Sequence, residues 1–264
     1  MQGGDMPEAL ELMRRSLGEQ GVLRAEAYWR WKHQHNPFGV SPVMIAEAYE
    51  ETCGIRAMMH WGFRKEGKQI SAYRAVDTAT DPLHQGKGIF SRLTMAMVES
   101  LQAGNSALIF NTPNGRSMPG YLKMGWQRSG RTRLRICLNP AGLVKNHLLR
   151  RPRPEVSGLS ETFPDVIGDI LEAHARNFHD QLTTDCTPQY LRWRYIDIPG
   201  IRYNWSVREE GKNACLLVWR LKQNFRLTEL RLLDIFFSGS PQVVQTAIKE
   251  LVAQTRPDVV TVLV

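Results

Sequence analysis

Two glycines, Gly86 and Gly88, separate a strand-like apolar run from an amphipathic helical pattern. Residues 75–80 precede them, and apolar residues recur at helical spacing over residues 90–101. At such a junction the first backbone N–H groups of the helix have no partner, and the positive end of the helix dipole lies behind them. A pyrophosphate fits this arrangement, because glycines allow close backbone approach and positive φ. The alternative is an ordinary strand-to-helix turn.

The spacing excludes two common phosphate-binding motifs. The loop lacks the G-x-x-x-x-G-K-S/T pattern of a nucleoside-triphosphate cradle and the third glycine of a dinucleotide fingerprint. A second stretch follows, in which Asn111 closes a short apolar strand and Asn114 comes shortly after it. Residues 119–126 then read Pro-Gly-Tyr-Leu-Lys-Met-Gly-Trp. Found together, the two stretches are a far more specific signal than either stretch alone.

Together the two stretches resemble the signature of the GCN5-related N-acetyltransferase (GNAT) superfamily. Its first half is Gln or Arg, two residues, Gly, one residue, then Gly or Ala; here Gln85 and Gly88 fit, and Phe90 takes the last place. Its second half is an Asn at a strand end followed by a helix that ends in Tyr-x-Lys-x-Gly-aromatic, as in residues 111–126. More narrowly, the chain is similar to a bacterial, tandem two-copy branch in which Phe is usual at that place. The resemblance covers residues 5–138.

The resemblance implies acetyl-CoA, or another short acyl-CoA, as co-substrate and no metal. The co-substrate would lie between the strands that end at Thr80 and Asn111, with the pantetheine on the backbone of residues 78–80 and on Asn114. The pyrophosphate would bind the amides of residues 85–91. The implied binding residues are Thr78, Ala79, Thr80, Gln85, Gly86, Lys87, Gly88, Ile89, Phe90, Ser91, Asn111 and Asn114.

The same resemblance places Tyr121 near the thioester sulfur. A phenol is protonated at neutral pH and can give its proton to the departing thiolate, while a backbone N–H near Ala79 polarises the carbonyl. A structural interpretation stays open, since a half-buried tyrosine with a satisfied hydroxyl is the usual case.

Asp77 is our candidate for the general base, because its strand runs beside the expected position of the thioester. His60, Glu47 or a water relay are the alternatives. Equally, Asp77 caps a turn or pairs with Arg74.

The order of predicted elements divides the chain into two copies of one α/β fold, each a mixed, mostly antiparallel sheet flanked by helices. The boundary is expected at the proline-rich residues 150–154, which gives a catalytic domain over residues 1–150 and a second domain over residues 151–264. Tyr-x-Arg-Trp-basic occurs at residues 28–32 and again at residues 190–194, before strand-like runs of similar spacing. Its tryptophans (Trp29 with Trp31 in the first copy, Trp193 in the second) are expected in the core.

The second copy is expected to be degenerate and incomplete. Gly239 and Pro241 replace the glycine loop, and a proline has no N–H to offer. Nothing in it corresponds to residues 118–138, whose last part, residues 131–138, alternates as a strand in the first copy. We therefore predict that this half binds no coenzyme A and either shapes the acceptor pocket or holds a homodimer.

Charge and composition narrow the class of protein. Lys and Arg number 34 against 26 Asp and Glu, and the whole net charge of +8 falls in residues 1–150, which favours an anionic ligand there. We see no signal peptide or transmembrane segment, and the four dispersed cysteines show no metal spacing, so we expect a cytoplasmic protein.

Three functions compete. The first is an N-acyltransferase that moves an acetyl group from acyl-CoA to the primary amine of a small molecule, such as an amino sugar, or of a peptide. The second is a non-catalytic module that binds coenzyme A or a nucleotide. A nucleic-acid binder ranks last, because basic residues are not interleaved with aromatic ones.

Overall fold

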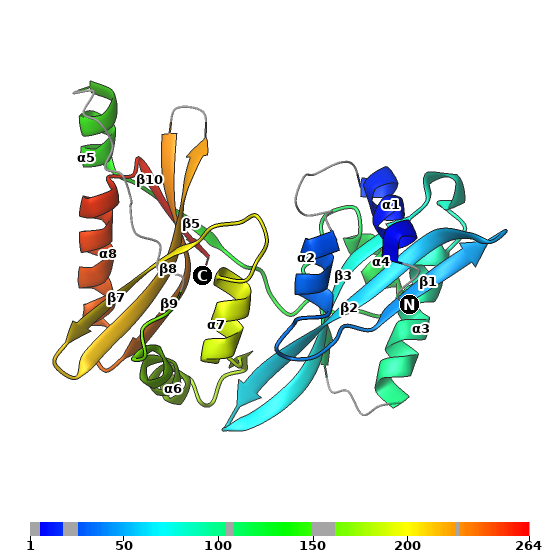
Figure 1. Ribbon diagram of the computed structural model, residues 1–264, viewed down its shortest axis with the longest axis horizontal. Helices are drawn as coiled ribbons and strands as arrows, with labels where there is room; N and C mark the ends of the chain where they lie inside the picture. The colour runs from blue at the N-terminus through cyan, green and yellow to red at the C-terminus, as the bar shows by residue number, and fades with distance from the viewer. Residues whose placement is uncertain (1–5, 18–25, 104–107, 149–161, 225–226, 264) are drawn as a thin grey trace. The chain divides into compact units, whose positions relative to one another are not determined.

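The structure is a computed structural model that describes residues 6–17, 26–103, 108–148, 162–224 and 227–263. Its contacts form two compact units. The first is Met1–Arg128 with His179–Asp185 and Asp197–Gly200, and the second is Ser129–Phe178 with Cys186–Ile196 and Ile201–Val264. Each unit is a sheet with helices packed on it (Figure 1).

The sheet of the first unit has the order β1-β2-β3-β4, with β6 beside β2. Neighbours β1, β2 and β3 are antiparallel, whereas β3 and β4 are parallel. The strands are β1 Val43–Ala48, β2 Glu51–Lys65, β3 Lys68–Thr80, β4 Leu108–Phe110 and β6 Thr183–Thr184.

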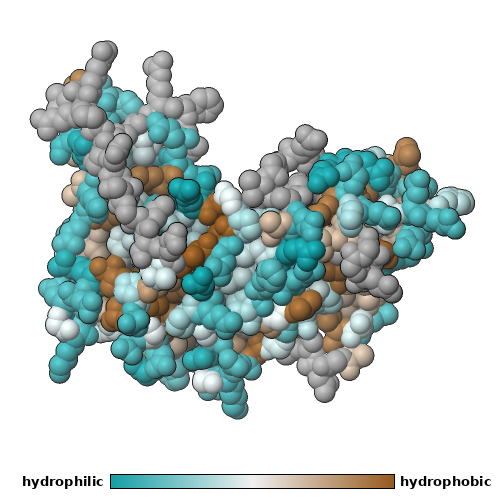
Figure 2. All heavy atoms as spheres, viewed as in Figure 1, coloured by the Kyte–Doolittle hydropathy of each residue, from teal (hydrophilic) through white to brown (hydrophobic). Residues whose placement is uncertain are grey.

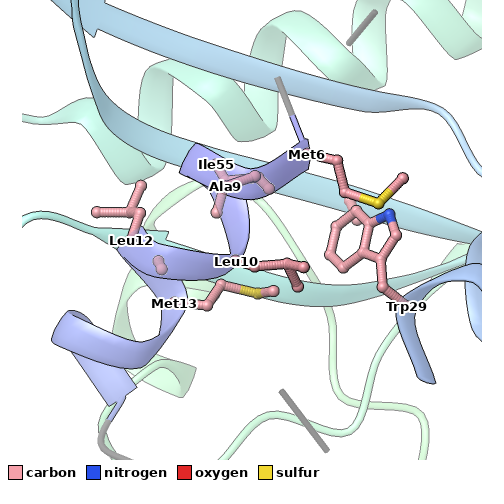
Figure 3. Packing of buried hydrophobic residues seen from close by; sticks show 9 residues of the cluster. Met6, Ala9, Leu10, Leu12, Met13, Trp29 and Ile55 are labelled. Carbon is pink, nitrogen blue, oxygen red and sulfur yellow. The ribbon is translucent and has the colours of Figure 1, made fainter. Parts of the chain in front are cut away.

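Four helices cover the two faces of this sheet, α1 (Met6–Leu17) and α2 (Glu26–His33) on one and α3 (Ile89–Ala103) and α4 (Met118–Lys123) on the other (Figure 1). Side chains alternate along β2, so Ile55 faces α1. Figure 3 shows Leu10 and Met13 of α1 packed around Ile55 and Trp29.

Met58, on the opposite face of β2, belongs instead to the cluster beneath α3 and α4. This second cluster supports the candidate site.

The sheet of the second unit has the order β5-β10-β9-β8-β7, with β9 and β10 parallel and the other pairs antiparallel. The strands are β5 Leu134–Leu138, β7 Asn204–Glu210, β8 Asn213–Asn224, β9 Leu227–Ser238 and β10 Val259–Leu263. The helices are α5 Pro140–Leu143, continued by a π-helical turn at Val144–Leu148, α6 Ile167–Asn177, α7 Pro188–Tyr195 and α8 Gln242–Thr255. The core lies between α8 and strands β8 and β9.

The two units repeat one order of elements: two helices, three antiparallel strands, a helix and a parallel strand. The predicted fold class and duplication are therefore confirmed. The repeated motif lies on α2 and on α7, and its tryptophans are buried as expected, Trp29 and Trp31 in the first copy and Trp193 in the second.

Two strands lie in a different sheet from the one that the sequence suggested. β5 pairs with β10 of the second sheet, so residues 131–138 do not extend the first sheet, and the second sheet does not stop at β10. β6, which lies beyond residue 150, pairs with β2 of the first sheet. Alternation of side chains identifies a strand but not its partner, and the free edges of β10 and β2 determine where these strands pair.

Contacts beyond the strand pairing hold β5 in the second unit. The Asn139 side chain donates to the Pro257 carbonyl at 2.7 Å, and Asn146 donates to Asp258 at 2.9 Å. The contacts thus divide the chain at residues 128–129 rather than at 150. The predicted linker at residues 150–154 lies outside the described residues.

Among the described residues, no helix is long and apolar enough to cross a membrane, and no group of three metal-ligating side chains occurs. Most of the face drawn in Figure 2 is hydrophilic.

Candidate active site

The loop between β3 and α3 is anchored by Asp81, which is buried at the end of β3. Its carboxylate accepts a hydrogen bond from the Leu83 amide at 2.9 Å and caps a 3₁₀ turn at Pro82–His84. The same carboxylate lies 3.4 Å from the Arg15 guanidinium, and the Asp81 amide donates to Cys53 of β2. One aspartate therefore ties the start of the loop to α1 and β2.

Gly86 and Gly88 both have φ of 76°, as the sequence predicted. A Cβ atom added at either would meet no atom within 4 Å, so the backbone conformation and not crowding requires glycine. The first helical bond runs from the Arg92 amide to the Gly88 carbonyl at 3.0 Å. The amides of residues 89–91 thus precede the helical ladder and remain available to a ligand.

Strands β3 and β4 diverge beside this loop. They pair only from Ala72 to Arg74 of β3, against β4 Leu108–Phe110. Beyond Arg74, β3 runs on to Thr80 with no partner strand on that edge within the described part of the chain. A β-bulge at Asp77, whose φ is 40°, adds a bend there. The open edge can pair with an extended ligand in the manner of another strand.

A cavity of about 630 Å³ lies between this open edge, the loop and the start of α4. Its lining includes nine of the predicted binding residues: Thr78, Ala79, Thr80, Gln85, Gly86, Gly88, Ile89, Phe90 and Asn114. Lys87 lines an adjoining hollow of about 470 Å³ together with Arg92. Ser91, Asn111 and Tyr121 do not line the cavity itself.

Asn114 holds the chain that leads into α4. Its side-chain oxygen accepts from the amides of Arg116 and Ser117 at 3.0 and 2.9 Å. Asn111 lies nearer β4, and its side-chain nitrogen is buried without a hydrogen-bond partner among the described residues.

Tyr121 lies directly behind Phe90. The two rings meet edge to face at 5.3 Å, and Phe90 forms part of the cavity wall. Tyr121 is only 4% exposed, and its hydroxyl accepts a hydrogen bond of 2.7 Å from Nη2 of Arg56. Sequence analysis assigned no role to Arg56, although a single arginine inside the apolar run of β2 was a visible signal.

The Asp77 carboxylate faces α2, where it lies 2.6 Å from Lys32 Nζ and 2.8 Å from His33 Nε2. Burial alone would raise the pKa of Asp77, but the charge of Lys32 and the hydrogen bond with His33 hold that pKa well below its usual range. Arg74 donates to Thr112 instead. A carboxylate with such a low pKa is a weak base, so this geometry favours a structural role for Asp77.

The other candidate bases are also separated from the cavity. His60 Nε2 lies 3.0 Å from Ser71 Oγ, the ring stacks on Tyr73, and burial lowers the pKa of His60. Glu47 lies on β1 and lines the adjoining hollow.

In the second unit, Asp234 makes contacts like those that Asp77 makes in the first. Asp234 of β9 accepts a hydrogen bond from Tyr195, which ends α7, and Tyr195 in turn accepts one of 3.3 Å from Arg194. Both aspartates lie at or beside a bulge of the central strand pair, and both contact the last turn of the helix that carries the repeated motif. Burial raises the pKa of Asp234, in contrast to Asp77.

The loop of the second unit is closed by its own side chains. Asn213 accepts from the Ser240 amide at 2.8 Å, Ser240 Oγ accepts from the Gln242 amide at 3.4 Å, and Pro241 has no amide hydrogen. Gly239 has φ of 70°, and a Cβ atom there would overlap the Asn213 side chain.

Comparison with known proteins agrees with this geometry. Residues 1–129 match the family described as acetyltransferase (GNAT) domain. The first half of this chain is a GNAT domain. No curated protein matches the sequence.

Several solved structures share the fold of the whole chain. A probable N-acyltransferase from Enterococcus faecalis superposes with a TM-score of 0.76 at 12% identity, covering 100% of this chain and 64% of that chain. A GCN5-related N-acetyltransferase from Anabaena variabilis gives 0.66 at 14% identity, with coverage of 100% and 64%. Saccharomyces cerevisiae N-myristoyltransferase, solved with bound myristoyl-CoA, gives 0.58 at 11% identity, with coverage of 99% and 74%. The chain thus spans less than two thirds of the first two structures, and at these identities the likeness concerns the fold.

Proposed function

We propose that this protein is an N-acyltransferase that moves an acetyl or other short acyl group from acyl-CoA to the primary amine of a small molecule, such as an amino sugar. The observation that carries the proposal is the loop at residues 85–91, which borders a cavity beside the open edge of β3 and leaves the amides of residues 89–91 outside the helical ladder. The open space above Gly86 and Gly88 fits a pyrophosphate. Lys87 and Arg92 add positive charge beside it.

In this proposal the backbone at residues 78–80 holds the pantetheine arm as an added strand, with Asn114 at its side. The acceptor nitrogen attacks the thioester carbonyl, a backbone N–H near Ala79 stabilises the charge on the carbonyl oxygen, and the C–S bond breaks. Tyr121 Oη gives its proton to the leaving sulfur. This step requires the Phe90 ring to turn aside, since it separates Tyr121 from the cavity.

We assign the proton of the attacking amine to water rather than to Asp77. The Asp77 carboxylate is engaged by Lys32 and His33. Asp77 instead fixes the bulge that bends β3 away from β4.

The proposal is tested in two steps. Acetyl-CoA at millimolar concentration is expected to raise the melting temperature, and a panel of small primary amines is expected to release free coenzyme A thiol. No stabilisation and no thiol release would refute it. Stabilisation without release for any amine would favour the non-catalytic coenzyme A-binding module.

The variant Tyr121→Phe then tests the general acid. We expect kcat to fall by about 10²–10⁴-fold, as for loss of a positioned proton donor, with acetyl-CoA stabilisation retained. Tyr203→Phe, which removes a hydroxyl in the second unit, is the matched control. Undiminished turnover in Tyr121→Phe would remove Tyr121 from the mechanism.

A further inference from the structure

Arg56 is a fully buried cation, and no carboxylate pairs with it in the described part of the chain. It lies in the middle of β2 with 0% of its surface exposed. Nη2 donates to Tyr121 Oη at 2.7 Å, while Nε and Nη1 have no hydrogen-bond partner among the described residues. The guanidinium carbon lies 5.5 Å from the ring centre of Phe90 and 5.4 Å from that of Tyr121. Aromatic faces compensate a buried charge only in part, so this arrangement opposes folding.

The second unit shows that the fold does not need a cation at this place. Arg56 pairs with Thr78 immediately before the bulge in the first sheet. In the second sheet the bulge follows Val218, which pairs with Asp234 on the face toward α7. Its neighbours Leu217 and Trp219 belong to the cluster beneath α8, the helix that corresponds to α3. On the face where the first unit has Arg56, the second unit therefore has buried apolar side chains beside its bulge, and it has no counterpart of Tyr121 among its described residues.

The direction of the Arg56 hydrogen bond matters for the chemistry of Tyr121. Arginine carries donors only, so the phenol oxygen must accept and its hydrogen must point elsewhere. No hydrogen bond donated by the Tyr121 hydroxyl occurs within the described residues. The phenol is thus held as an acceptor with its own proton uncommitted.

We propose that Arg56 is a positioning residue that directs the Tyr121 proton toward the departing sulfur and then stabilises the phenolate. This inference rests on the proposed function. The acceptor nitrogen forms the new C–N bond, the C–S bond breaks, and the thiolate takes the proton of Tyr121 Oη. Tyr121 becomes a phenolate 2.7 Å from a guanidinium that stays protonated throughout, and water returns the proton. The acceptor nitrogen loses one proton to water, so the reaction balances.

The test uses Arg56→Met, with Arg56→Leu as a second apolar variant that copies Leu217 of the cluster beneath α8. Because an uncompensated charge is removed, we expect a melting temperature equal to or above that of the wild type. We expect kcat to fall about 100-fold, while the KM for acetyl-CoA changes less than about threefold. Arg56→Lys, which keeps a donor and a charge, is expected to recover part of the loss.

A double-variant cycle shows whether Arg56 acts through Tyr121. In the Tyr121→Phe background, Arg56→Met is expected to change kcat by less than about threefold, because the shared step is already lost. Independent, multiplicative losses would overturn the proposal. So would a lower melting temperature and weaker acetyl-CoA binding in both apolar variants, since these indicate a structural role.

The outcomes also separate this proposal from the proposed function. An active wild type with unchanged kcat in Arg56→Met would overturn the role of Arg56 alone. A wild type without acetyl-CoA stabilisation or thiol release would overturn both.

Discussion

The two loops that join a central strand to the following helix differ in where their amides point. In the first unit, two glycines at positive φ leave the amides of residues 89–91 outside the helical ladder, beside a cavity. In the second, Asn213 and Ser240 accept the amides of the loop, and Pro241 supplies none. The second unit retains the strand, the turn and the helix. A ligand site of this kind is therefore lost when a protein satisfies its own amides, without loss of the fold.

The aspartate contacts lead to the opposite conclusion, because they occur in both units. Asp77 contacts the end of α2 and Asp234 contacts the end of α7, beside the same bulge. A feature present in the unit with the open loop and in the unit with the closed loop belongs to the fold. The described residues of the second unit contain no counterpart of the Arg56–Tyr121 pair, and we connect this pair with chemistry.

Glycine substitutions should give the largest difference in effect between the two loops. Gly88→Ala places a side chain in a left-handed conformation that costs about 1–2 kcal/mol, and the loop amides should turn away from their ligand. We expect the KM for acetyl-CoA to rise about tenfold or more, measured by thiol release at saturating amine.

Gly239→Ala is the matched substitution in the closed loop. Its Cβ atom would overlap Asn213 and break the bond to the Ser240 amide, so we expect a loss of about 2 kcal/mol and a melting temperature lower by about 5 °C. The KM for acetyl-CoA should not change. A raised KM in Gly239→Ala would mean that the second loop takes part in binding.

The two aspartates should respond to pH with opposite slopes. The pKa of Asp77 is held below its ordinary value, so Asp77 stabilises the folded state above about pH 4 and this stabilisation is lost as the pH falls further. Asp77→Asn should lower stability by about 2 kcal/mol at pH 7, with a smaller deficit below about pH 4. The pKa of Asp234 is raised, so its charge weakens the folded state as the pH rises above about 4.

Melting temperatures of both variants between pH 3 and pH 8 measure these slopes. Relative to the wild type, Asp234→Asn should become more stable as the pH rises, and Asp77→Asn less stable. The kcat of Asp77→Asn should stay within about threefold of the wild-type value, whereas loss of a general base would lower kcat by about 10²–10⁴-fold. A loss of 100-fold would instead restore Asp77 as the base.

Lys87→Ala should have the smallest effect. Lys87 is exposed beside the loop, and an exposed charge contributes only about 0.2–1 kcal/mol. We expect the KM for acetyl-CoA to rise about threefold at low salt and to approach the wild-type value at high salt. Lys212→Ala, in the turn between β7 and β8 of the second unit, is the control that should show no change.

Local sequence patterns predicted much of the backbone geometry around the candidate site. The strand, the glycine φ values and the helix over residues 90–101 follow from the spacing of glycine and apolar residues, and the structure confirms them. The partners of Asp77 and Tyr121 did not follow, because they come from distant parts of the chain: Lys32 and His33 from α2, Arg56 from β2. A pairing between distant side chains depends on sheet register, which a single sequence specifies only weakly.

The assignment of strands to sheets failed for a related reason. The alternation at residues 131–138 identified a strand, but its polar and apolar faces are both exposed at the edge of the second sheet. The pattern therefore contained no information about a buried partner. The internal repeat carried more information, because it identified α2 and α7 as equivalent helices from the sequence alone.

Pairing of β5 with β10 has a consequence for biosynthesis. Residues 134–138 leave the ribosome long before residues 259–263, so the backbone N–H and C=O groups of β5 lack their partner strand until β10 has been made. An unpaired strand of this kind readily associates with other chains. The second sheet can therefore be completed only after synthesis has passed β10.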